Sequence, residues 1–92
     1  MGELDGVWEV KRVSGLLPPL IGVHKEISGT AGSTKLGALP GAPFDVVDHS
    51  FRYRPPFVGF VDEVTPHGDG YRGRATFCGR EFGKFEMRRP KT

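Results

Sequence analysis

The sequence has a single cysteine, no long apolar run and little net charge, and each of these shortages narrows the kind of protein it encodes. Cys78 is the one cysteine among 92 residues, which excludes an internal disulfide and fits a reducing compartment. No apolar stretch is long enough to cross a membrane as a helix, and the acidic N-terminus lacks the apolar core of a signal peptide. We therefore expect a cytoplasmic protein without membrane contact.

Charged and metal-ligating residues are also sparse. The net charge is +2, and the basic excess gathers in the run Arg88-Arg-Pro-Lys91, which is more typical of a solvated tail than of a nucleic-acid site. His24, His49 and His67 lie far apart, and none forms a metal-ligand spacing with another histidine or with Cys78. We expect surface histidines, no metal or other cofactor, and no nucleic-acid partner.

No catalytic constellation is visible. Cys78 stands beside Gly79 and would need a neighbouring base and an orienting group to act as a nucleophile. The sequence places neither beside it, so a half-exposed strand cysteine is expected. We predict that the protein is not an enzyme.

Turn-forming and aromatic residues are what the chain has in plenty. It contains 14 glycines, 8 prolines and 7 phenylalanines, and it has no long apolar period of 3.6 residues. This composition predicts many turns, short strands and few helices. We expect residues 1–92 to form a single all-β domain of about seven antiparallel strands, arranged as a small meander barrel or half-barrel.

The predicted strands alternate apolar with polar residues. In the second strand Ile21, Val23 and Ile27 share the apolar face, and Lys25 interrupts it with a stem that can snorkel to the surface. The third strand is expected at a sheet edge, and the fourth segment forms one strand or two, divided near residues 48–49. The segments are residues 6–13, 21–27, 34–39, 44–53, 58–64 and 71–77, followed by a last strand that ends at Arg88.

The C-terminal third, residues 58–88, is predicted as three consecutive antiparallel strands. Matching the apolar faces of the first two sets Val64 opposite Tyr71 and Asp62 opposite Gly73. A slip of one residue would turn apolar side chains onto the face rich in arginine. The consequence of this register is that a carboxylate, Asp62, lies on the apolar face.

The turn between the last two strands is predicted to span residues 79–81. That length sets Ala75 opposite Phe85 and suits both faces, with a bulge in the ladder. It leaves Phe82 near the turn on the outer face.

The start of the first strand, Gly6-Val-Trp8, resembles the calycin barrels: lipocalins, fatty-acid-binding proteins and the nitrobindin-like group. In those barrels the tryptophan plugs one end and an apolar connector follows the first strand, where this chain has Leu16-Leu-Pro-Pro-Leu20. The closing run Phe85-Glu-Met-Arg-Arg89 is also similar. The last histidine, His67, does not match the haem-ligating position of nitrobindin-like proteins, so the resemblance implies no haem. It implies a compact barrel with an apolar interior.

We therefore expect non-catalytic binding of a small apolar or amphipathic ligand inside the barrel. Asp62 is expected either as a polar contact in that pocket or as a structural group at the barrel mouth, paired with arginine or backbone amides. The alternative is a protein-interaction module without a ligand. A homodimer is expected in either case, because so short a chain has a small core. The predicted lining is Trp8, Val10, Phe60, Asp62, Tyr71, Phe77, Phe85 and Met87.

Overall fold

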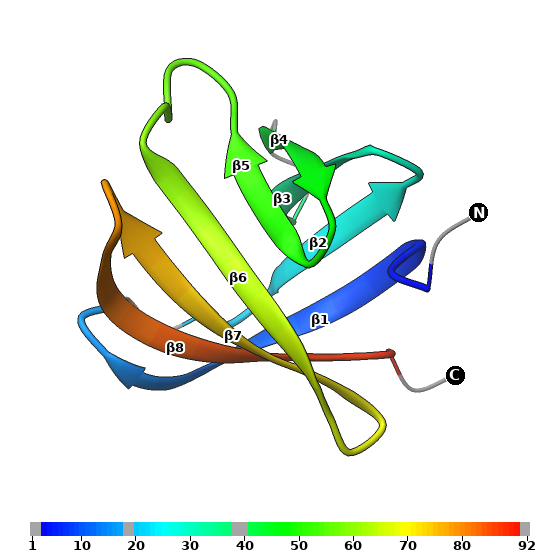
Figure 1. Ribbon diagram of the computed structural model, residues 1–92. Helices are drawn as coiled ribbons and strands as arrows, with labels where there is room; N and C mark the ends of the chain where they lie inside the picture. Colours follow the sequence, from blue (N-terminus) through cyan, green and yellow to red (C-terminus); the bar gives the residue numbers. More distant parts are fainter. Residues whose placement is uncertain (1–2, 18–19, 38–40, 91–92) are drawn as a thin grey trace.

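The computed structural model describes residues 3–17, 20–37 and 41–90, which form a closed antiparallel barrel (Figure 1). The strands follow one another around the barrel in chain order, and the last pairs back onto the first. The all-β meander barrel is therefore confirmed, with full closure and eight strands instead of about seven. They are β1 (Gly6–Gly15), β2 (Val23–Ser28), β3 (Ala31–Leu36), β4 (Ala42–Val47), β5 (Ser50–Tyr53), β6 (Phe60–His67), β7 (Gly70–Phe77) and β8 (Arg80–Arg88).

Closure corrects two predictions in the N-terminal half. The third strand does not lie at an edge, because β3 pairs with β2 on one side and with β4 on the other. The second strand begins at Val23, and Ile21 lies before it in a turn with 86% of its surface exposed. The predicted strand end at Leu39 and the proline pair at residues 18–19 lie outside the described residues.

Tight turns explain why so short a chain reaches eight strands. Residues 29–30, 48–49, 68–69 and 78–79 each join two strands as a two-residue loop. The first residue of every one of these loops has a positive φ, between 51° and 62°. A positive φ at the first central position is a feature of the type I′ and II′ hairpin turns, whose twist matches that of the flanking strands. The turn at residues 48–49 splits the predicted fourth segment into β4 and β5.

The hairpin of β6 and β7 has the predicted faces but not the predicted register. Val64 lies opposite Gly73 and Asp62 opposite Ala75, two residues away from the expected pairs. A shift of two preserves which side chains point inward, since the side-chain period of a strand is two. Asp62 is therefore inside the barrel as predicted, although its neighbour across the ladder is a different residue.

The turn between β7 and β8 is shorter than predicted. Cys78 and Gly79 form a two-residue loop, with φ values of 51° and 86°. Phe82 is the extra residue of a bulge, because Thr76 pairs with Glu81 and Ala75 with Gly83. The predicted bulge is thus present, but Phe82 turns toward the core and does not lie on the outer face.

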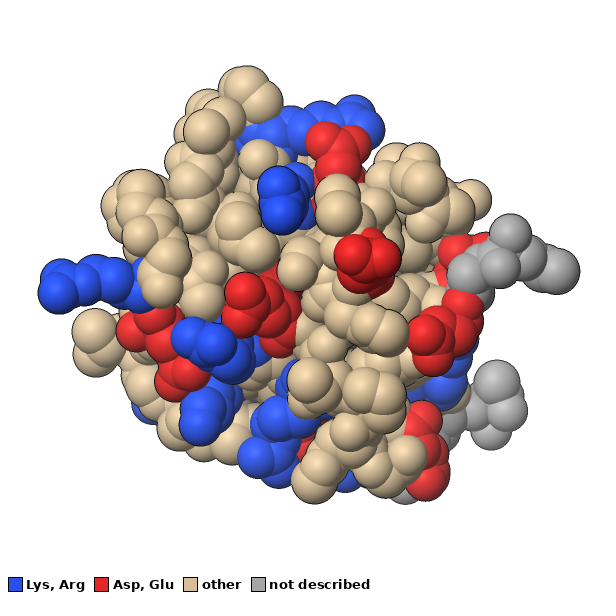
Figure 2. Space-filling view, viewed as in Figure 1, with Lys and Arg blue, Asp and Glu red and all other residues tan. Residues whose placement is uncertain are grey.

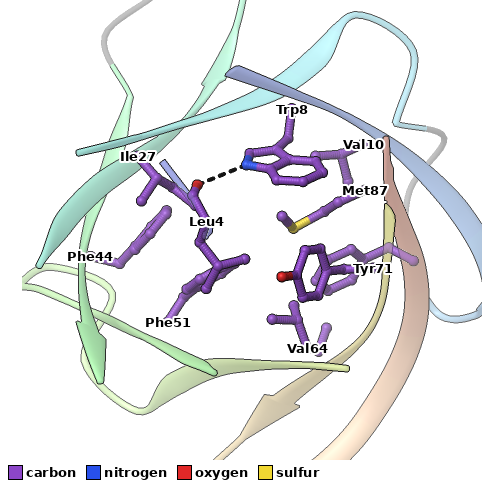
Figure 3. Packing of buried hydrophobic residues seen from close by; sticks show 11 residues of the cluster. Leu4, Trp8, Val10, Ile27, Phe44, Phe51, Val64, Tyr71 and Met87 are labelled. Atoms are coloured by element: carbon purple, nitrogen blue, oxygen red, sulfur yellow. Dashed lines mark hydrogen bonds between the residues drawn. The ribbon is translucent and has the colours of Figure 1, made fainter. Parts of the chain in front are cut away.

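The interior of the barrel is filled by large apolar side chains from all parts of the chain (Figure 3). Trp8 is 2% exposed, its indole N–H donates to the carbonyl oxygen of Leu4 at 2.9 Å, and Tyr71 meets it edge-on. Phe44 stacks on Phe51 with ring centroids 4.7 Å apart. Because every one of these groups contacts others in the cluster, the centre of the barrel is a packed core.

Two interior glycines make room for this packing. A Cβ atom on Gly73 would collide with the ring of Phe85, and one on Gly32 would collide with the ring of Phe44. The rings therefore lie across bare backbone on the neighbouring strand. Alternating large and small interior residues is how a narrow barrel fills its cross-section.

Replacing Trp8 with alanine should lower the free energy of unfolding by about 3–5 kcal/mol, because it removes a large buried side chain and its hydrogen bond. Urea unfolding of the native and variant proteins measures the loss. Val7→Ala is the matched control on the same strand, since Val7 is exposed, and it should cost less than about 1 kcal/mol. A tryptophan emission maximum typical of full exposure in the native protein would contradict the burial of Trp8.

Candidate functional site

The two ends of the barrel differ in chemistry. In an antiparallel meander the β1–β2, β3–β4, β5–β6 and β7–β8 connections share one end, which we call the mouth. Figure 2 shows mainly uncharged surface at the top left of the view, with basic and acidic side chains beside it and charges of both signs interspersed elsewhere on this face. Most of the large apolar side chains exposed in the described residues lie at the mouth: Leu16, Ile21, Leu36, Phe57, Val58 and Phe77.

A small pocket of about 220 Å³ opens at the mouth. Its walls are mainly apolar, and they come from the ends of β2, β3 and β4 together with Phe57 of the β5–β6 connection. Thr34 is the one hydroxyl group in the lining, and its side chain belongs to a polar cluster deeper in the barrel. The lining residues are Val23, Thr34, Lys35, Leu36, Gly41, Ala42 and Phe57.

Beneath this pocket lies a buried lysine with a complete set of partners. The ammonium of Lys25 donates to Thr34 Oγ1 at 2.6 Å, to the Tyr53 hydroxyl at 2.8 Å and to Asp62 Oδ2 at 3.0 Å. Lys25 is 3% exposed and Asp62 7%. The Tyr53 hydroxyl also donates to Asp62, at 2.8 Å. All three ammonium protons are therefore used, as a buried lysine requires.

Aromatic rings surround the same ammonium. Its nitrogen lies 5.3–5.7 Å from the ring centroids of Phe44, Phe51, Tyr53 and Phe85. At this range the negative faces of aromatic rings attract a cation. The interior of the barrel is thus an aromatic cage with one carboxylate, and the cation inside it is part of the chain itself.

The surroundings decide the charge state of this cluster. Burial alone would lower the pKa of Lys25, but the attraction of Asp62 and the contacts with Tyr53 outweigh it, so the pKa is raised above its ordinary value. Burial raises the pKa of Tyr53, so the phenol keeps its proton at neutral pH. A lysine that stays protonated and has no solvent access is neither a nucleophile nor a base. The arrangement therefore favours a structural role for Lys25.

The predicted lining residues fall into two groups. Phe60 is half-buried, and Phe77 is 46% exposed at the mouth, where its ring lies 4.7 Å from that of Phe60. The other members are part of the packed interior. The buried ones are Trp8, Val10, Asp62, Tyr71, Phe85 and Met87.

Sequence reasoning missed the partner of Asp62. The predicted partners were arginine or backbone amides, and the snorkelling predicted for Lys25 is wrong. The signal was present in the pattern. Lys25 lies between Val23 and Ile27 on the inward face of its strand, and Asp62 lies between Phe60 and Val64 on the inward face of another. A buried charge is strongly destabilising without a partner, so two opposite charges inside one small barrel are expected to form an ion pair.

Comparisons with protein-family models, with curated proteins and with solved structures found no match. Among the described residues no helix is long and apolar enough to span a membrane. The same residues contain no group of three or more histidine, cysteine, aspartate or glutamate side chains placed to hold a metal ion. The fold and the site therefore define the protein as a closed eight-stranded meander barrel with a packed interior and an apolar mouth.

Replacing Lys25 with methionine should lower the free energy of unfolding by about 3–5 kcal/mol, because it leaves Asp62 buried without its cation. Adding Asp62→Leu should restore most of that loss, since an apolar pair replaces the ion pair. Urea unfolding of the single and double variants measures both effects. Lys84→Met, at an exposed position, is the control and should change stability by less than about 0.5 kcal/mol. A double variant no more stable than the single one would show that the loss comes from packing alone.

Stability should also fall at high pH. The raised pKa of Lys25 means that its contribution is complete below the ordinary lysine value of 10.5 and is lost as the pH rises through the folded value. The raised pKa of Tyr53 acts in the same direction, because the unfolded chain releases the phenol proton first. Circular dichroism during urea unfolding between about pH 8 and 11.5 measures the slope. The slope should be shallower in the double variant Lys25→Met with Asp62→Leu, and equal slopes would contradict the assignment.

Proposed function

We propose that the protein binds a small apolar or amphipathic ligand at the mouth of the barrel, without catalysing a reaction on it. The observation that carries the proposal is the mouth pocket, whose lining combines mostly apolar residues with the side chains of Thr34 and Lys35. Ligand sites in proteins commonly combine apolar walls with a few polar groups, and the mouths of barrels are frequent places for them. A pocket of about 220 Å³ suits a short alkyl chain or one small ring.

The mouth is favoured over the centre of the barrel because the centre is filled. The aromatic cage encloses Lys25, and Asp62 already accepts hydrogen bonds from Lys25 and Tyr53. A ligand in the cage would have to displace a cation that makes three hydrogen bonds. At the pocket, a polar group of the ligand needs only to reach Thr34, whose oxygen has a second lone pair.

A relationship with the calycins is part of the proposal. It rests on the Gly6-Val-Trp8 start, on the closed eight-stranded meander and on the closing run of β8. The guanidinium of Arg89, just after β8, lies 3.7 Å from the centre of the Trp8 ring. First and last strands are thereby joined at the barrel end that Trp8 fills, opposite the mouth.

A homodimer is the second candidate, and the exposed side chains of the mouth favour it. Leu36, Phe57, Val58 and Phe77 are each more than 40% exposed at one end of the molecule. Clustered apolar surface on a small protein commonly marks an interface. The dimer would bury this end against a second copy and leave the pocket closed.

The ligand proposal is tested with 1-hexanol, whose hydroxyl can donate to Thr34, as the probe, titrated into isotope-labelled protein and followed by NMR. Saturable shifts should centre on the amides of Val23, Thr34 and Ala42. Ala42→Leu fills the pocket and should weaken binding of the probe at least tenfold, whereas Ala31→Leu, at an exposed position at the other end of β3, should leave it unchanged.

Two results would overturn this proposal. Shifts that avoid the pocket amides, or an Ala42→Leu variant that binds as well as the native protein, would remove the mouth as the site. Sedimentation that shows a dimer dissociating on dilution, with Phe57→Ser abolishing it, would favour the homodimer.

A further inference from the structure

The first strand, β1, is longer than β2, which pairs with only part of it. β1 pairs with β2 only from Gly6 to Glu9, and with β8 from Glu9 to Gly15. No described residue before His24 pairs with β1, and the amide of Val23 bonds to the carbonyl of Leu20. Over residues 10–15, β8 is therefore the one strand that lies beside β1 in the described part of the chain.

A groove of about 800 Å³ lies beside β1 where this strand leaves β2, and it borders the first three residues of the unpaired half, Val10, Lys11 and Arg12. Its floor is apolar and reaches the core, because Val10 is buried and Leu20 and Val23 pack against the interior cluster. The other lining residues, which form the rim, are Val7, Glu9, Lys11, Arg12, Ile21, Gly22, His24 and Pro90.

We propose that this groove is a docking site for an extended, acidic peptide segment of a partner protein, which adds to β1 as an extra strand. An unpaired strand edge presents backbone donors and acceptors, and an extended peptide satisfies them. The free half of β1 is about 20 Å long at roughly 3.4 Å per residue, which matches a segment of five or six residues. Alternate side chains of that segment would enter the apolar floor.

The charges of the rim favour an acidic partner segment. Lys11 is exposed and makes no ion pair among the described residues, and the guanidinium of Arg12 bonds only to the carbonyl of Gly15. Glu9 is the single carboxylate of the rim. A second copy fits less well, because its own β1 edge carries the same excess of cations over carboxylates as the rim that it would meet. Acidic side chains alternating with apolar ones complement both the floor and the rim.

The probes are two blocked hexapeptides, one alternating valine with glutamate and one alternating valine with lysine. NMR of labelled protein should show shifts centred on residues 10–14 with the acidic peptide, and slower hydrogen exchange of the alternate amides that do not bond to β8. The lysine peptide should bind at least tenfold more weakly. An acidic peptide methylated on alternate backbone nitrogens should not bind, because it cannot complete the strand ladder.

Charge reversal gives the matched comparison. Lys11→Glu should weaken binding of the acidic peptide at least fivefold, while Arg52→Glu, exposed on β5 in another part of the wall, should not change it. No shifts at millimolar acidic peptide, equal binding of the lysine or methylated peptide, or shifts confined to the mouth would each overturn the proposal. So would slow exchange of the free β1 edge without peptide, and so would sedimentation showing that two copies pair through it.

Discussion

The pair formed by Lys25 and Asp62 is the constraint on which the rest of the barrel depends. Removing two charges from water costs several kcal/mol for each ion, and their attraction offsets this only with good geometry and further hydrogen bonds. Here the geometry involves four strands, because Lys25 is on β2, Thr34 on β3, Tyr53 on β5 and Asp62 on β6. A register error in any of these strands would leave a buried charge without its partner, so the cluster selects one alignment around half of the barrel.

The faces of the strands could be predicted from the sequence, but their registers could not. Alternation tells which residues point inward, and a two-residue slip leaves that set unchanged, so the apolar pattern cannot distinguish Val64 opposite Tyr71 from Val64 opposite Gly73. The geometry of the turns decides which of these registers the strands adopt. The loop at Cys78 needs a cysteine at positive φ, which side chains other than glycine, asparagine and aspartate rarely adopt, and nothing in the sequence announces it.

The candidate site was predictable only where it depends on the alternation. Lys25 and Asp62 are each a charged residue on an otherwise apolar strand face. Predicting that they form an ion pair required no more than the assumption that the barrel is closed. The mouth is different. Its exposed side chains, such as Leu36 and Phe57, come from the ends of strands and from irregular connections, where no period assigns a side chain to the inside or the outside. Their clustering follows from the topology, which brings alternate connections to one end.

Closure itself explains why β1 has an open half. The first strand of a meander barrel must pair with the second strand on one side and with the last strand on the other. A strand that bends away from one neighbour toward the other pairs with each of them over only part of its length. In β1 the change of neighbour falls at Glu9, and the bulge near Val13 follows it on the β8 side. An open sheet would have two free edges along whole strands. Among the described residues the barrel leaves shorter unpaired stretches, including residues 10–15 of β1 on the β2 side and residues 65–67 of β6 on the β5 side, so the backbone available to a partner is limited to the ends of strands.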